Sequence, residues 1–157
     1  MANMLIVHGG APTAVINASL YGAVKEAKKH GCIDKIYAAI GGSGAVIREQ
    51  FLDMKTVDEQ RLELLPFTPA SAIGTSRDHL EPEDYQAIAR VIAKNDIKYV
   101  FFNGGNGSMD ACGKVYSACR ELGVDVQVVG IPKTIDNDIA VTDHAPGFGS
   151  AARYIAA

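Results

Sequence analysis

Strand-like and helix-like patterns alternate along this chain, and this alternation limits its fold more than any other feature. The strand-like runs are short and mostly apolar, and they cover Met4–His8, Lys35–Ile40, Tyr99–Asn103 and Val126–Ile131. The helix-like segments repeat apolar residues at helical spacing, and they cover Val15–His30, Pro82–Asn95, Ser108–Leu122 and a segment from Gly147 onward. Continuous apolar strands that alternate with helices are typical of a parallel sheet covered on both faces. We therefore predict an α/β fold, a Rossmann-like three-layer sandwich with a mostly parallel sheet.

Composition narrows the class of protein. The 157 residues are enough for one domain with a real core, and the net charge of -3 comes without any cluster of Lys or Arg. This charge predicts no binding to nucleic acid or to an anionic membrane. The apolar runs are too short to span a membrane, Met1–His8 does not resemble a signal peptide, and the three cysteines form no CxxC pair. These features predict a cytoplasmic protein with reduced thiols, in which Cys112 and Cys119 are core residues.

A glycine-rich loop, Gly104-Gly105-Asn106-Gly107-Ser108, lies between an apolar strand and a predicted helix. Glycines allow a ligand to approach the backbone closely, and the first N–H groups of the helix attract anions. We expect Asn106 or Ser108 to cap the helix. The loop lacks the Gly-Lys-Ser/Thr of a Walker A motif and the GxGxxG spacing of a dinucleotide site. The alternative is a tight strand-to-helix turn that binds nothing.

Two further glycine turns follow strands, at Gly9-Gly10 and at Gly41–Gly44. Because the strands of one parallel sheet point their carboxyl ends the same way, we predict that the three turns form a cradle for polyphosphate. Arg77, in the loop Gly74–Asp78, is a candidate to contact an anion there. An exposed arginine that is merely solvated is the alternative.

The polar loop Pro132-Lys133-Thr134-Ile135-Asp136-Asn137-Asp138 is the candidate catalytic segment. Phosphoryl transfer to an alcohol requires a carboxylate that accepts the hydroxyl proton and Mg²⁺ that neutralises the phosphates. Asp136 and Asp138 could divide these roles, while Lys133 could contact a phosphate. The alternative is a solvated turn stabilised by side-chain hydrogen bonds to its own backbone.

These residues, in this order, resemble the phosphofructokinase family of ATP- and pyrophosphate-dependent sugar-phosphate kinases. The resemblance spans essentially the whole chain, and it rests on Gly9-Gly10, Asn17-Ala18, Gly74–Arg77, Gly104–Ser108 and Pro132–Asp138. The last stretch is highly specific, whereas NAD kinases and lipid kinases carry a glycine motif like that at Gly104–Ser108. The resemblance implies a 6-phosphofructokinase of glycolysis. Such an enzyme transfers a phosphoryl group from ATP or pyrophosphate to the 1-hydroxyl of fructose 6-phosphate, with Mg²⁺.

The resemblance also implies roles for individual residues. Asp136 would be the base toward the sugar 1-hydroxyl, Thr134 would contact the sugar phosphate or the transferring group, and Lys133 would contact a phosphate. Asn106 and Asp138 would lie at the metal. The phosphoryl donor would be bound by Gly9, Gly10, Arg77, Gly104, Gly105, Asn106, Gly107 and Ser108.

Two departures from the family pattern leave alternatives open. The family usually has aspartate, a Mg²⁺ ligand, where this chain has Asn106, so a non-catalytic nucleotide- or phosphate-binding module of the same fold is the second hypothesis. Gly107 leaves room for the α-phosphate of ATP, whereas Lys133 is typical of pyrophosphate enzymes, and we favour ATP by a small margin.

Family chains are considerably longer than this one. We therefore expect residues 1–157 to be the N-terminal donor-binding domain of a phosphofructokinase, with little activity alone. The full-length enzyme is expected to be a homo-oligomer, either a dimer or a tetramer.

Overall fold

A computed structural model describes the backbone of residues 1–157 and every side chain except that of Ala14. The strands are β1 (Ala2–His8), β2 (Ile33–Ala39), β3 (Phe51–Asp53), β4 (Ile97–Gly104) and β5 (Gln127–Pro132). The helices are α1 (Ala14–Ala27), α2 (Ser43–Ile47), α3 (Glu59–Glu63), α4 (Pro82–Lys94), α5 (Asn106–Glu121) and α6 (Phe148–Ala156). Short 3₁₀ turns at Met54–Thr56 and Leu65–Phe67 flank α3.

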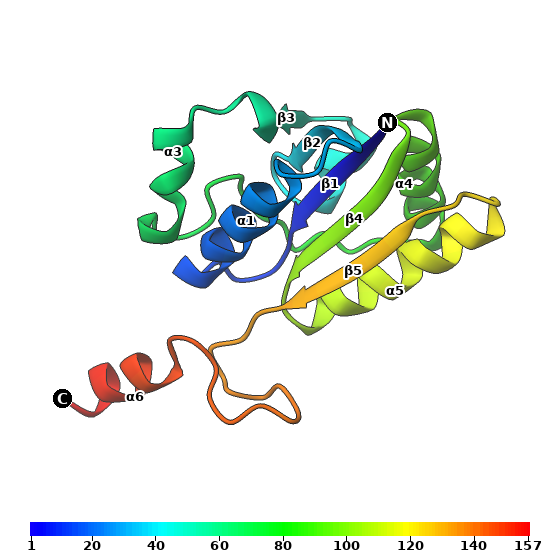
Figure 1. The fold of residues 1–157 in the computed structure, drawn as a ribbon. Helices are drawn as coiled ribbons and strands as arrows, with labels where there is room; N and C mark the ends of the chain where they lie inside the picture. The colour runs from blue at the N-terminus through cyan, green and yellow to red at the C-terminus, as the bar shows by residue number, and fades with distance from the viewer.

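The strands form one five-stranded sheet in the order β3-β2-β1-β4-β5. β1, β2, β4 and β5 run parallel, and only the short β3 pairs antiparallel with β2. Helices α1 and α3 lie on one side of the sheet, and α4 and α5 lie on the other (Figure 1). The predicted three-layer α/β sandwich with a mostly parallel sheet is confirmed.

The central strand β1 shows why such strands read as continuous apolar runs. Its alternate residues Leu5 and Val7 pack into the core beneath α4 and α5. The residues between them, Met4 and Ile6, pack into the core beneath α1. Because both faces of β1 are covered, every position in its second half must be buried, which removes the polar alternation of a half-exposed strand.

Helix α5 buries both of its cysteines, as the sequence predicts. Cys112 and Cys119 lie in the core between α5 and the sheet. Burial raises the pKa of the Cys119 thiol to about 11, and it also raises the pKa of Cys112. Both side chains therefore stay protonated near neutral pH and act as small apolar residues.

Two differences from the predicted helices matter most. Helix α1 ends at Ala27 rather than at His30, and the chain then turns. The N-cap of α5 is Gly105, which has no side chain to cap with, so the predicted capping by Asn106 or Ser108 is wrong. The Ser108 side chain instead packs close to Gly9 and Gly104, where it fills the space that a Cβ would need.

Helix α6 projects away from the sheet at the end of the long segment that follows β5 (Figure 1). Gly147 provides its N-cap with a φ of 91°, a left-handed conformation that suits glycine. Among the helices that the structure describes, none combines the length and the apolar character needed to cross a membrane.

Candidate active site

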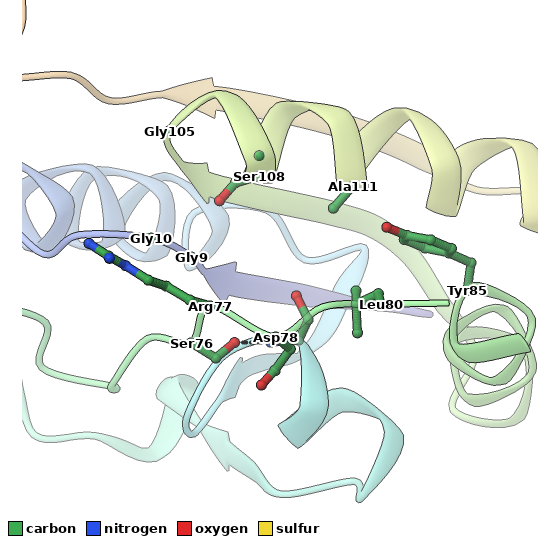
Figure 2. A pocket seen from close by; sticks show the side chains of 12 residues that line it. Gly9, Gly10, Ser76, Arg77, Asp78, Leu80, Tyr85, Gly105, Ser108 and Ala111 are labelled. Atoms are coloured by element: carbon green, nitrogen blue, oxygen red, sulfur yellow. Dashed lines mark hydrogen bonds between the residues drawn. The ribbon is translucent and has the colours of Figure 1, made fainter. Parts of the chain in front are cut away.

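A cavity of about 290 Å³ lies at the carboxyl ends of the parallel strands β1 and β4 (Figure 2). The loops after β1 and β4 form its walls, together with the segment that contains Arg77 and the start of α2. The structure thus gathers at one place the glycine turns that the sequence predicts to form a cradle. The predicted donor-binding residues that line the cavity are Gly9, Gly10, Arg77, Gly105, Gly107 and Ser108.

Hydrogen bonds to the loop after β1 fix the segment that carries Arg77. The backbone N–H of Gly10 donates to the Ser76 carbonyl at 3.0 Å, and the Thr75 hydroxyl donates to the Gly10 carbonyl at 2.8 Å. Gly9 and Ser76 also form a parallel bridge. This pairing places Arg77 beside the first glycine turn, and Figure 2 shows its side chain extending past Gly10. A guanidinium in this position can contact an anion held by the cradle.

Gly104 makes the close approach of the β1 and β4 loops possible. A Cβ at Gly104 would lie 2.3 Å from Ser108 Oγ and 2.5 Å from the Gly9 carbonyl oxygen. Because one of these neighbours is backbone, no side-chain rotation can relieve the overlap. The glycine is therefore required by the packing of the cradle, although Gly104 does not itself line the cavity.

Replacing Gly104 with alanine is expected to lower the free energy of unfolding by about 2 kcal/mol, because the new methyl group overlaps the Gly9 loop. Urea denaturation measures this change. The matched control is Gly113→Ala in α5, where an added Cβ meets no described atom within 4 Å. Alanine forms helices better than glycine, so the control is expected to gain up to about 1 kcal/mol. Equal unfolding midpoints for both variants would contradict this account.

The candidate catalytic loop lies beside the glycine loop. The backbone N–H of Lys133 donates to the Gly104 carbonyl at 2.8 Å, and the Lys133 ammonium donates to the Ala11 carbonyl. Burial lowers the pKa of Lys133, Asp136 opposes this change, and Arg77 adds to it. Asp136 and Arg77 therefore both lie close enough to Lys133 to influence its charge, although Arg77 comes from a distant segment of the chain.

Thr134 organises the two aspartates of this loop. Its hydroxyl donates to Asp138 Oδ1, and it accepts a bond of 3.0 Å from the backbone N–H of Asp136. The Thr134 hydroxyl holds the pKa of Asp138 below its usual value, and the Asn106 amide adds to this effect. The two residues predicted at the metal, Asn106 and Asp138, therefore lie together although they come from different loops.

These two side chains are compatible with Mg²⁺, but they form an incomplete site. Among the described side chains, no group of three from His, Cys, Asp and Glu comes together as a set of metal ligands. Mg²⁺ in phosphoryl-transfer sites commonly takes one or two carboxylates and completes its octahedron with phosphates and water. The carboxylate of Asp138, with the side-chain amide of Asn106 beside it, fits that pattern.

The remaining predicted residues lie next to the cradle rather than in it. Lys133 and Thr134 line a second cavity of about 240 Å³, which also has His144 on its wall. Asp136 lines neither cavity and is exposed in the loop. The predicted site residues therefore fall into two groups. One group lies around the cradle, and the other lies on the loop after β5.

Sequence reasoning missed part of the 290 Å³ cavity. The residues not singled out are Ser43, Ser76, Asp78, Leu80, Tyr85 and Ala111. Ser43, Ser76 and Asp78 belong to loops that the glycine pattern had already marked. Leu80, Tyr85 and Ala111 gave no signal, because an apolar or aromatic residue in or near a helix is indistinguishable in sequence from a core residue.

The amino-acid sequence is similar to those of known proteins. The family model described as phosphofructokinase matches residues 3–157. A pyrophosphate–fructose 6-phosphate 1-phosphotransferase of Rhodospirillum rubrum is 39% identical over 153 residues, covering 98% of this chain and 38% of the relative. An ATP-dependent 6-phosphofructokinase of Amycolatopsis methanolica is 30% identical over 138 residues, covering 87% of this chain and 29% of the relative.

A solved structure agrees with these matches. The crystal structure of a pyrophosphate-dependent phosphofructokinase from Nitrosospira multiformis superposes with a TM-score of 0.90 at 38% sequence identity. The superposition covers 98% of this chain and 39% of that chain. The chain therefore spans less than half of the length of these relatives.

Proposed function

Because this chain belongs to the phosphofructokinase family, we propose that it forms the N-terminal, donor-binding part of a 6-phosphofructokinase. The observation that carries the proposal is the glycine cradle with Arg77 beside it, next to the carboxylates of the loop after β5. The reaction is transfer of a phosphoryl group to the 1-hydroxyl of fructose 6-phosphate. The whole enzyme is proposed to act in cytoplasmic glycolysis as a homo-oligomer, a dimer or a tetramer.

The residues of this chain supply positioning, charge and one base. Backbone N–H groups of the cradle and the guanidinium of Arg77 hold the donor phosphates and stabilise the charge that spreads over them during transfer. Lys133 adds a cation at the edge of the cradle. Asp136 accepts the proton of the sugar hydroxyl, and Thr134 contacts the transferring group.

Asn106 and Asp138 are the residues that would hold Mg²⁺, which neutralises phosphate charge when bound. Asp138 is already deprotonated in its contacts with Thr134 and Asn106, so no proton must be displaced from it.

We propose pyrophosphate as the donor, in place of the ATP that sequence reasoning favoured. An added Cβ at Gly107 would meet no described atom within 4 Å, so the space there permits ATP without requiring it. Lys133, by contrast, is a specific cation directed at the loop that carries Gly9 and Gly10. Two of the relatives reported above carry pyrophosphate in their names at 38% and 39% identity, against 30% for the ATP-dependent relative.

A coupled assay on the longest reading frame that encodes this chain tests both parts of the proposal. We expect fructose 6-phosphate to be phosphorylated with Mg²⁺ and pyrophosphate, at a kcat/KM at least about tenfold higher than with ATP. Turnover with ATP alone would overturn the choice of donor and leave the reaction standing. No turnover with either donor would overturn the kinase and favour the second candidate.

The second candidate is a phosphate-binding module without catalysis, and Asn106 is the observation that favours it. An amide supplies an oxygen but no negative charge, so it holds Mg²⁺ more weakly than a carboxylate. If both donors fail in the assay, Asn106→Asp is the variant to measure next. Activity gained by that variant alone would support the module, with the metal as the missing part.

A further inference from the structure

A chain of buried and half-buried polar side chains lies beneath the cradle, and the proposed mechanism does not use it. Its centre is His8 at the end of β1, whose side chain is fully buried. His8 Nδ1 is 2.8 Å from Ser71 Oγ, and His8 Nε2 is 3.3 Å from Asn103 Nδ2. Asn103, at the end of β4, is also fully buried. A buried imidazole with a partner on each ring nitrogen has a defined orientation and a defined tautomer.

The partners fix which ring nitrogen carries the hydrogen. The Ser71 hydroxyl donates to the Gly74 carbonyl at 2.8 Å, so its only hydrogen is already used and its oxygen must accept from His8 Nδ1–H. The Asn103 amide group donates to the Ile16 carbonyl at 2.9 Å, which identifies its nitrogen, and it presents its second N–H to His8 Nε2. His8 is therefore neutral, with the hydrogen on Nδ1 and the lone pair on Nε2.

This series of hydrogen bonds ends on the segment that carries Arg77. Ser71 and Gly74 belong to that segment, and further along it Ser76 accepts a hydrogen bond from the backbone N–H of Gly10, in the loop after β1. A neighbouring asparagine, Asn17 in α1, anchors the beginning of the segment through the carbonyls of Thr68 and Ala70 and the N–H of Ala72. Of these anchors, only the one through His8 connects the segment to both β1 and β4.

We propose that His8 is a positioning residue, which holds the Ser71–Arg77 segment against β1 and β4 and so sets Arg77 over the cradle. The link to ligand binding rests on the proposed function, because it assumes that Arg77 contacts the donor phosphates. The tautomer of His8 and the anchoring of the segment do not depend on that assumption.

An apolar residue could fill the same volume, but it would break the chain of donors and acceptors. Ser71 Oγ would lose a donor, and one N–H of Asn103 would lose its acceptor inside the protein. Among the described side chains, Asn103 Oδ1 is already buried without a partner, so these losses would add to an existing deficit of hydrogen bonds. Buried polar groups without partners are unfavourable, and the segment is expected to relieve them by moving out toward water.

The first experiment determines the tautomer in the full-length protein. Selective ¹⁵N labelling of histidine and long-range ¹H–¹⁵N correlation distinguish a protonated from an unprotonated ring nitrogen. We expect Nδ1 of His8 to be protonated and Nε2 to be unprotonated at pH 7.5. The opposite tautomer would overturn the proposal directly, because Ser71 could not then accept from the imidazole.

The second experiment uses a matched set of variants of the same protein. His8→Leu is expected to weaken the binding of pyrophosphate with Mg²⁺, measured by calorimetry, by about tenfold, since Arg77 loses its fixed position. It is also expected to speed amide hydrogen exchange in Ser71–Arg77. His8→Gln keeps one donor and one acceptor and is expected to restore most of the affinity. Val24→Ala, in the core under α1 and outside the network, is expected to lower stability without changing the affinity.

The outcomes separate this proposal from the proposed function. Unchanged affinity and unchanged exchange in His8→Leu would overturn the positioning role, as would an equal loss of affinity in Val24→Ala. A third result is possible, in which neither the wild type nor any variant binds pyrophosphate but His8→Leu still speeds amide exchange in Ser71–Arg77. That result would show that the proposed donor site is wrong and would support the anchoring role of His8. If His8→Leu does not fold, the tautomer of His8 in the wild-type protein still decides.

Discussion

Replacing Asp136 with asparagine is expected to lower kcat for phosphoryl transfer to fructose 6-phosphate by about 10³-fold in the longest reading frame that encodes this chain. The amide has the shape of the carboxylate but cannot accept the hydroxyl proton. Asp136 is exposed and its side chain makes no hydrogen bond that holds the described fold together. We therefore expect the variant to fold normally and to bind pyrophosphate with an affinity within about twofold of wild type.

The coupled assay and a calorimetric titration with pyrophosphate measure these two quantities separately. The matched control is Asp143→Asn, because Asp143 is an exposed aspartate in the same long segment after β5. Its side chain has no role in the proposed chemistry, so the control should keep kcat and affinity. A kcat for Asp136→Asn within about threefold of wild type would show that this carboxylate is not the base.

The second large effect is a loss of stability in mild acid caused by His8. Burial lowers the pKa of His8 from its ordinary value of 6.5 to about 4. The unfolded chain therefore takes up a proton on this residue at a higher pH than the folded chain does. The contribution of neutral His8 to stability is present in full above pH 6.5 and is lost as the pH falls through about 4, with a total of about 3 kcal/mol.

Urea denaturation at pH values between 7.5 and 4 measures this effect as a difference between wild type and His8→Gln. The difference is needed because acidic groups such as Glu49 and Glu59 have lowered pKa values and also reduce stability as they are protonated, in the lower part of the range. Wild type is expected to lose stability from about pH 6.5 downward. The His8→Gln variant should lose stability only in the lower part of the range, where the acidic groups are protonated. Parallel curves for the two proteins would show that His8 is not held neutral by the fold.

The sheet was predictable because its strands are buried on both faces. In β1 and β4, burial on two sides leaves nearly continuous apolar runs, which differ from the helical spacing around them. The gathering of Gly9, Gly10 and Gly104–Ser108 followed from the same pattern, since parallel strands end at one edge of the sheet. The topology itself, with β1 between β2 and β4, left no mark on the sequence.

What could not be predicted depends on contacts between distant segments. Ser108 looked like a helix cap, but Gly9 and Gly104 leave a space that its side chain occupies. His8 belongs to no motif in the sequence, and only its position between Ser71 and Asn103 gives it a role. Tyr85 lines the cavity because α4 crosses near α5, which local sequence does not report.

The central claim is that the strand-end cradle binds the phosphates of the donor. Titration of ¹⁵N-labelled protein with pyrophosphate and Mg²⁺, followed by amide chemical shifts, tests it most directly. The account expects saturable shifts at the N–H groups of Gly9, Gly10 and Gly105–Ser108, and weaker effects elsewhere. Saturable shifts at another surface, or no saturable shifts at all, would contradict it.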